Sequence, residues 1–228
     1  MRLLPVVTLS LVIGCQWSPC DTRRSLSEQI DVQDAASAKI VAYAGSLRVT
    51  GDAGISRVEA SAEACASDEA ALDEMDLLVE RRGEEVYVET VMGGGHGWST
   101  NRRMDLVVSL PDSLAVEIID KSGDLRVERV ATAKIDDKSG NIVVDDVRGS
   151  LEIEDKSGDI RIDHVVGDVR VDDKSGNVQV SNVSGDVIVY DKSGDIIVRD
   201  VAGGLSVPDD GSGEVDHKNV QGRVTLDD

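Results

Sequence analysis

Five evenly spaced copies of the tetrapeptide Asp-Lys-Ser-Gly constrain the fold of this chain more than any other feature. They begin at Asp120, Asp137, Asp155, Asp173 and Asp191, and a variant copy, Asp-Gly-Ser-Gly, begins at Asp210. The intervals between copies are 17, 18, 18, 18 and 19 residues. A fixed short period of this kind is typical of repeat architectures, in which each copy forms one structural unit.

Each repeat carries apolar residues at fixed positions. When the first Asp is position 0, aliphatic residues recur at positions 5, 7, 10, 14 and 16. The pairs 5/7 and 14/16 are two residues apart, so each pair points to one side of a β-strand. Glycines at positions 3 and 12 divide the repeat into two halves, each a corner followed by a β-branched strand. One such unit cannot bury its apolar face alone, whereas stacked copies can.

We therefore predict an all-β fold in which residues 119–228 form a parallel β-solenoid, or β-helix. It would have about six coils of roughly 18 residues and two strands each. At about 4.8 Å per coil, the rod would be about 29 Å long. An antiparallel sandwich also has short strands and frequent turns, but it does not explain why each column keeps its chemistry at an 18-residue step.

Stacking predicts that polar residues of successive repeats form ladders. Position 4 alternates carboxylate with amide, which avoids contacts between like charges and gives each carboxylate an amide donor. Its members are Asp124, Asn141, Asp159, Asn177, Asp195 and Glu214. Position 0 is always Asp and position 1 is Lys in five repeats, so we expect the Lys column to offset the charge of the Asp column. Both columns are interpreted as structural.

The N-terminus predicts export and lipidation. Residues 1–14, MRLLPVVTLSLVIG, combine one Arg with an apolar run too short to span a membrane, as signal peptides do. The segment Val12–Cys15 (VIGC) resembles a bacterial lipobox, and this resemblance implies cleavage before Cys15 and a lipid on its sulfur. Gln16 follows where an Asp would favour inner-membrane retention in Gram-negative cells, so the outer membrane is expected. The sequence does not distinguish its periplasmic face from its surface face.

The mature chain would be strongly acidic. Cleavage removes Arg2 from the 24 basic residues, which leaves 23 against 44 acidic residues and a net charge of −21. Nucleic-acid binding relies on Lys and Arg, so a nucleic acid is excluded as a natural partner. The charge suits a soluble body held at a membrane by its lipid.

The region between the signal and the repeats has no regular period. We interpret residues 15–37 as the lipidated cysteine and a polar linker, and residues 38–118 as a β-rich part that covers the open edge of the first coil. Asp68–Met75 is the only helix-compatible stretch, with Ser67 as its N-cap. Cys20 and Cys65 would form a disulfide in an oxidising envelope, which would pin the N-terminal tail to the domain.

Several segments carry a family likeness. They are Ala44–Val49 (AGSLRV), Ala64–Ser67 (ACAS), Leu110-Pro111 and the Ser-Gly-Asp-Ile-x-Val coils. In this order, over about residues 38–228, they resemble the bacterial envelope proteins called putative adhesins with β-strand repeats, a domain-of-unknown-function family. The resemblance implies a β-helix-like fold, export, frequent lipid anchoring and very little chemistry. This chain differs in having Lys at position 1, where the family would more often have Gly.

Two function classes follow first from these features. The favoured one is a monomeric, non-catalytic envelope module with a structural or adhesive role, or one that binds an envelope protein or a glycan. The other is an enzyme on a β-helix scaffold, such as a hydrolase or lyase acting on a polysaccharide. Enzymes need a singular site, whereas the Ser, Asp and Lys residues repeat in successive coils. We therefore expect no catalytic residues.

Two further hypotheses remain open. The protein could be a calcium-stabilised binding module, with Asp120, Asp124, Asp155 and Asp159 as candidate oxygen ligands. Asp-Lys-Ser-Gly-Asp spaces its oxygens as the start of an EF-hand loop does, but the later Gly and acidic residue of that loop are missing. It could also assemble into filaments through the open end of the solenoid. Against filaments stand His217, Glu214 and the acidic C-terminal tail.

Overall fold

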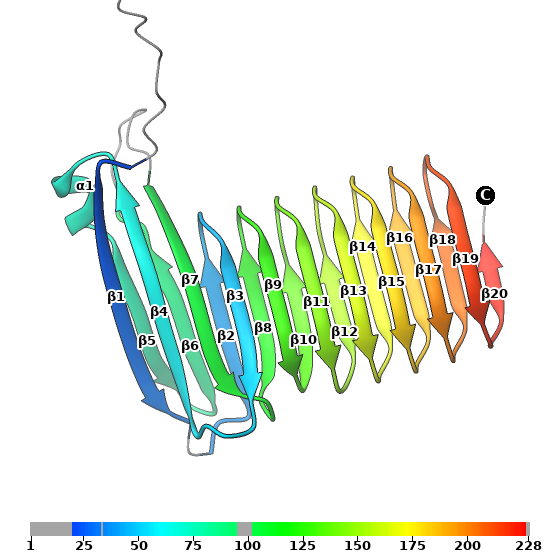
Figure 1. The fold of residues 1–228 in the computed structure, drawn as a ribbon, viewed down its shortest axis with the longest axis horizontal. Coiled ribbons are helices and arrows are strands. Elements are labelled where there is room, and N and C mark those ends of the chain that lie inside the picture. Colours follow the sequence, from blue (N-terminus) through cyan, green and yellow to red (C-terminus); the bar gives the residue numbers. More distant parts are fainter. Residues whose placement is uncertain (1–19, 33, 95–101, 227–228) are drawn as a thin grey trace, which may run out of the picture.

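Two ten-stranded β-sheets run along the whole length of a rod, with β1 near one end and β20 at the other (Figure 1). The computed structural model describes residues 20–32, 34–94 and 102–226. Each sheet grows by one strand per coil along the rod, and the apolar core lies between the sheets. Within the described residues, no helix has the length and hydropathy that a membrane span requires.

Along the rod, the strands of each sheet succeed one another in an order that differs from their order in the chain. Sheet A consists of β1 (Thr22–Asp31), β4 (Arg57–Ala66), β7 (Arg102–Pro111), β3 (Leu47–Asp52), β9 (Leu125–Val130), β11 (Ile142–Val147), β13 (Ile160–Val165), β15 (Val178–Val183), β17 (Ile196–Val201) and β19 (Val215–Val220). Sheet B consists of β5 (Asp76–Arg82), β6 (Glu85–Val91), β2 (Ser37–Ala42), β8 (Ala115–Asp120), β10 (Thr132–Asp136), β12 (Leu151–Glu154), β14 (Val169–Asp173), β16 (Val187–Asp191), β18 (Leu205–Asp209) and β20 (Val224–Leu226).

The repeats form the predicted parallel β-solenoid. Strands β9 to β20 make six coils, each with one strand in sheet A and one in sheet B. The register is parallel and in step with the sequence period, so Ile142 faces Ile160 and Ile160 faces Val178. The aliphatic columns are buried in five of the six coils. The period therefore reflects stacking around one continuous core.

A stack of glycines explains why position 3 never varies. Gly158 has a φ of +143° and its N–H donates to the carbonyl of Ser175 in the next coil. A Cβ on Gly158 would lie 1.9 Å from the carbonyl oxygen of Gly140. The same close approach joins Gly123 to Gly45, so Gly45 is the equivalent corner in the N-terminal region. Only glycine fits such a corner.

The expected polar linker is wrong for part of its length, because residues 22–31 form strand β1. β1 pairs antiparallel with β4 over ten residues, from Thr22 opposite Ala66 to Asp31 opposite Arg57. Leu26 and Ile30 pack against the core from this strand. Its polar alternate residues face solvent, which is why its composition reads as a linker although the segment is an edge strand.

Parallel stacking also begins earlier in the chain than residue 119. β2 pairs in parallel with both β6 and β8, and β3 pairs in parallel with both β7 and β9. The β2–β3 coil therefore lies between the β6–β7 coil and the β8–β9 coil. Because spatial order and chain order differ here, no regular sequence period is visible. The antiparallel pairs β1–β4 and β5–β6 complete the two sheets at this end.

The single described helix is shorter than expected and has a different N-cap. Helix α1 spans Glu69–Asp73. Its N-cap is Asp68, which has an extended backbone and accepts a 2.8 Å hydrogen bond from Ala71 N. The expected cap, Ser67, instead donates its hydroxyl to Asp68. The Asp side chain reaches the free N–H group, so the helix starts one residue later.

The last coil of the rod, formed by β19 and β20, is largely exposed. At the C-terminal end, β19 and β20 are the last strands of their sheets, and most of β19 is exposed. His217 occupies the place of a core aliphatic residue in this last coil and is exposed.

Candidate functional site

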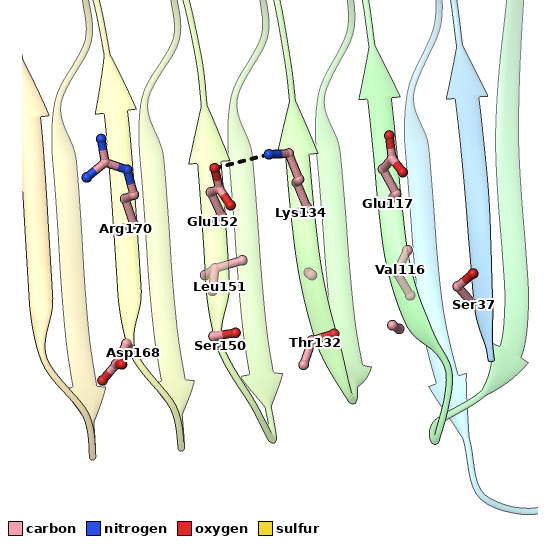
Figure 2. Close-up of a pocket in the computed structure, with 12 residues that line it drawn as sticks. Ser37, Val116, Glu117, Thr132, Lys134, Ser150, Leu151, Glu152, Asp168 and Arg170 are labelled. Carbon is pink, nitrogen blue, oxygen red and sulfur yellow. Dashed lines mark hydrogen bonds and ion pairs between the residues drawn. The ribbon is translucent and has the colours of Figure 1, made fainter.

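A groove lies on sheet B, across β8, β10, β12 and β14 (Figure 2). It has a volume of about 390 Å³. One row of its lining consists of small residues at the strand starts, among them Ser37, Thr132 and Ser150. The second row is charged and is formed by Glu117, Lys134, Glu152 and Arg170. The first row therefore carries hydroxyl groups on Ser37, Thr132 and Ser150, with Ala115 between Ser37 and Thr132, and it lies beside the charged row.

The charged row alternates in sign. Lys39, Glu117, Lys134, Glu152 and Arg170 are successive register partners across five strands of sheet B. Lys39 Nζ lies 2.7 Å from Glu117 Oε1, and Lys134 Nζ lies 3.1 Å from Glu152 Oε1. The hydrogen bond to Glu117 is the main reason that the pKa of Lys39 is raised. This face therefore suits a polar, uncharged or zwitterionic partner better than a strongly charged one.

The Asp column at position 0 points into the core. Asp120, Asp137, Asp155, Asp173 and Asp191 are at most 2% exposed. Oδ1 of Asp155 accepts hydrogen bonds from Lys156 N at 2.6 Å and Ser157 N at 3.2 Å, so it caps the corner. Oδ2 of each column member has no hydrogen-bond partner among the described residues. Burial accordingly raises the pKa of Asp155 to about 6.

The Lys column does not offset this charge, contrary to expectation. Lys138, Lys156, Lys174 and Lys192 are exposed, and no ion pair within the described residues joins them to the Asp column. Successive residues at a strand end point to opposite sides, so the acid enters the core and the adjacent base enters solvent. The acids are accommodated by backbone N–H groups instead.

The position 4 ladder has the predicted amide contacts. Asn141 Nδ2 donates to Asp124 Oδ1 at 3.1 Å, and Asn177 Nδ2 donates to Asp159 Oδ1 at 3.1 Å. Backbone N–H groups add a second set of bonds, such as Asp159 N to Asn141 Oδ1 at 3.2 Å. These side chains therefore link one coil to the next.

The four calcium candidates do not converge. Asp120 and Asp155 are buried, whereas Asp124 and Asp159 are exposed in the position 4 ladder. Within the described part of the chain, the one group of three or more potential metal ligands whose donor atoms cluster is different. It consists of Asp145, Asp163 and His164.

Of the predicted cysteine sites, two fall within the described residues. Cys20 and Cys65 lie with their Cα atoms 5.5 Å apart and are joined as a disulfide between the start of β1 and β4. Cys15, the expected lipidation site, lies outside the described residues.

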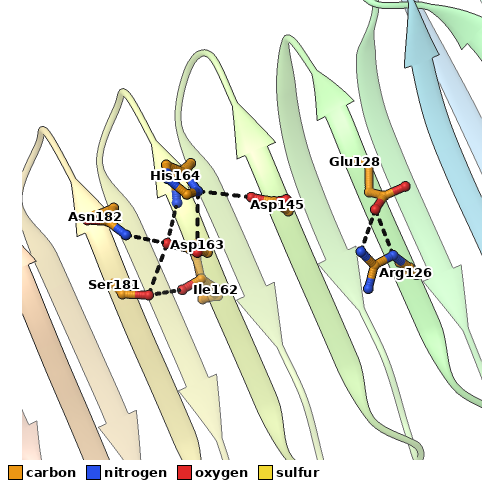
Figure 3. Close-up of polar contacts among 8 residues, drawn as sticks. All are labelled: Arg126, Glu128, Asp145, Ile162, Asp163, His164, Ser181 and Asn182. Carbon is orange, nitrogen blue, oxygen red and sulfur yellow. Dashed lines mark hydrogen bonds and ion pairs between the residues drawn. The ribbon is translucent and has the colours of Figure 1, made fainter.

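Each repeat coil carries a left-handed residue that is not glycine, one position before the end of its sheet A strand. These residues are Arg129, Asp146, His164, Asn182, Asp200 and Asn219, with φ between 53° and 60°. In Figure 3, His164 of this row lies beside Asp145 and Asp163, and Asn182 reaches back to Asp163. We refer to these six residues as the left-handed row.

The family model described as Toastrack DUF4097 matches residues 38–225. This chain belongs to the Toastrack family. The match confirms the family resemblance of its coils and covers β2 to β20 as far as Thr225. No curated protein matches the chain.

Solved structures similar to this Toastrack chain include three bacterial proteins. A "putative cell adhesion protein" from Clostridium sporogenes ATCC 15579 is 14% identical, with a TM-score of 0.40 over 90% of this chain and 99% of that one. A "putative adhesin" from Bacteroides fragilis NCTC 9343 is 13% identical, with a TM-score of 0.38 over 90% and 96%. A "putative adhesin" from Parabacteroides distasonis ATCC 8503 is 14% identical, with a TM-score of 0.34 over 90% and 96%.

Sequence reasoning missed two features of this Toastrack chain. It assigned no role to Asp145, Asp163 and His164, although Asp145 and Asp163 share position 8 in consecutive repeats. It also identified no groove on sheet B. The signal for both was present, because residues at the same position in neighbouring repeats become register partners. The left-handed backbone that turns His164 toward the two acids could not be predicted from the residue types.

Proposed function

We propose that this Toastrack protein is a lipid-anchored, non-catalytic module of the cell envelope. It would be exported, carry its lipid on Cys15 and sit at the outer membrane as a monomer. Its sheets would then be available to an envelope protein or a glycan. The proposal includes no catalytic step, because the candidate Ser, Asp and Lys residues recur coil after coil and form no singular site.

The observation that carries the proposal is the position of the chain's start on the rod. Cys20 is joined to Cys65 of β4, close to the sheet A edge strand β1, while β20 lies at the opposite end (Figure 1). Five residues of fully extended chain span at most about 18 Å. A lipid on Cys15 would therefore hold the β1 end of the rod close to the membrane.

The disulfide supports the same arrangement. β1 is an edge strand with one neighbour, so pulling on its first residue would peel it from β4. The bond between Cys20 and Cys65 connects the start of this strand to β4 covalently. Ten coil levels at about 4.8 Å each give a rod about 43 Å long between the first and last strands. The groove on sheet B would be presented along this rod.

Fractionation of cells tests the anchor. The full chain expressed in a Gram-negative host should be found in the membrane fraction and incorporate a labelled fatty acid. Cys15→Ser should abolish both, whereas Cys20→Ser should keep the label and lose only the disulfide. Membrane association of Cys15→Ser equal to that of the unchanged chain would contradict the anchor.

Site-specific photo-crosslinking in the same cells tests the binding face. A crosslinking amino acid at Ser150, in the groove, should give discrete adducts with an envelope component. The matched position is Arg161, exposed on β13 of sheet A, where we expect none. Equal adducts at both positions, or none at Ser150, would show that the groove is not the binding face. The lipid anchor is tested separately by the fractionation experiment.

A further inference from the structure

Two adjacent coils place three potential metal ligands at one corner of the rod. Asp145 on β11 and Asp163 on β13 are register partners in sheet A. The next residue of the second coil, His164, belongs to the left-handed row and has a φ of +53°. This conformation turns the imidazole back toward the preceding coil, where it meets both carboxylates (Figure 3).

The distances at this corner fit a small tetrahedral ion. His164 Nδ1 lies 3.1 Å from Asp145 Oδ1 and 3.3 Å from Asp163 Oδ2. One donor atom from each of the three residues lies within 4.8 Å of the others. In a tetrahedral site with bonds of about 2.0–2.1 Å, neighbouring ligand atoms are about 3.3–3.4 Å apart. The ligands would need to move little to bind an ion of this size.

Asp163 is held in the orientation that such a site needs. Its Oδ1 accepts from Asn182 Nδ2 at 2.7 Å, from Ser181 Oγ at 3.0 Å and from His164 N at 3.1 Å. Oδ2 is left facing the imidazole. Burial alone would raise the pKa of Asp163, but the bonds from Asn182 and Ser181 outweigh it and lower the pKa. The three donors fix Oδ1, so Oδ2 is the oxygen of Asp163 that is available to a metal ion.

The charge at this corner is incompletely balanced. In the preceding coil Glu128 occupies the same position 8, and it forms ion pairs with Arg126 and Arg48. Asp145 and Asp163 have no Lys or Arg within ion-pair distance in the described chain, and His164 is their only basic neighbour there. Two stacked carboxylates that share one imidazole favour a cation between them.

We propose that Asp145, Asp163 and His164 bind one divalent transition-metal ion of the Zn²⁺ class, linking the second and third coils. An imidazole nitrogen with two carboxylate oxygens suits Zn²⁺, Co²⁺ or Ni²⁺ and not Ca²⁺, which takes oxygen ligands. Water from the exposed side completes the coordination, because the His164 side chain is 62% exposed.

Titration calorimetry of the purified full chain with Zn²⁺, and separately with Ni²⁺, tests the proposal. We expect one saturable site per chain, a higher melting temperature with metal, and no comparable response to Ca²⁺. His164→Asn should weaken Zn²⁺ binding at least 10-fold, as should Asp145→Asn. Asn is the natural residue at the equivalent left-handed position of the next coil, Asn182, so the variant keeps the corner.

His217→Asn is the matched control, because it also removes one exposed histidine but lies on β19 at the end of the rod. It should bind Zn²⁺ as the unchanged chain does. Melting without metal shows whether each variant is folded. Equal Zn²⁺ affinity in His164→Asn and the unchanged chain would overturn the proposal. So would the absence of saturable binding up to millimolar Zn²⁺, which would leave His164 as an ion-pair partner of the two acids.

Discussion

Asp173 and Asp191 are register partners at the ends of β14 and β16, and each buries one carboxylate oxygen that accepts no hydrogen bond from a described residue. Three more coils repeat this relationship, with Asp120, Asp137 and Asp155. An ionised carboxylate is expensive to bury in this way, and neighbours of like charge add to the cost. A proton removes both costs. The column therefore couples the stability of the solenoid to pH.

The first prediction is that stability falls as pH rises from about 4 to about 6. The pKa of Asp120, Asp137, Asp155 and Asp191 is raised from 3.8 to about 6, mainly by burial. Between these values the folded chain binds more protons than the unfolded chain, so the free energy of unfolding decreases with rising pH. Each of these aspartates should lower the free energy of unfolding by an amount of the order of 1 kcal/mol over this pH range. Urea unfolding at pH 4.5, 5.5 and 7.5 measures this, and a flat profile would contradict it.

The second prediction concerns Asp155→Asn. The amide oxygen can keep the bonds from Lys156 N and Ser157 N, while the amide NH₂ replaces the unpartnered oxygen without a charge. We expect the variant to be more stable than the unchanged chain by about 1 kcal/mol at pH 7.5 and about equal to it at pH 4.5. Asp172→Asn, on the same strand as Asp173 and less buried, is the control for the loss of one charge. A uniform gain at both pH values would show that the column is not the cause.

The third prediction uses two neighbouring valines. Val165 is 1% exposed in the core column, whereas Val166 is 60% exposed. Val165→Asp should destabilise the chain by several kcal/mol, because the new charge has no partner in the core. Val166→Asp should change stability by less than about 0.5 kcal/mol. Thermal melting of the two variants compares them directly, and equal melting temperatures would refute the assignment of core and surface.

The fourth prediction tests the glycine stack. Gly158→Ala places a Cβ 1.9 Å from the Gly140 carbonyl oxygen at a φ of +143°, so either the corner or the stack must move. We expect a loss of about 3 kcal/mol. Gly94→Ala serves as the comparison, since nothing lies within 4 Å of the added Cβ there. Equal melting temperatures of the two variants would show that close backbone contact is not the reason for glycine at position 3.

The repeat made the solenoid predictable, and irregular connectivity limited the rest. The Val165 column and the Asn141–Asp124 ladder follow from the repeat, whose step is 17 to 19 residues, because equal positions become register partners. The β2–β3 coil could not be placed in this way, since it lies between two coils that follow it in the chain. Strand β1 was hidden by its polar outer face.

At the candidate sites, the repeat predicted which residues share a column but not where their side chains point. Asp155 and Lys156 are adjacent, so they were expected to neutralise each other, yet one faces the core and the other faces solvent. The approach of His164 to Asp145 depends on a left-handed backbone in a residue that is not glycine. Such a backbone is uncommon outside glycine, so nothing in the local sequence indicated that the histidine would turn toward the acids.

The left-handed row has a consequence for how such proteins diversify. Glycine is the usual solution at a backbone of this kind, and it would have left a bare edge. Here each coil keeps a side chain instead, and the six are an arginine, two aspartates, a histidine and two asparagines on one unchanging backbone. The side chain at this position can therefore be substituted in one coil at a time, at intervals of about 4.8 Å along the edge, while the core columns stay the same.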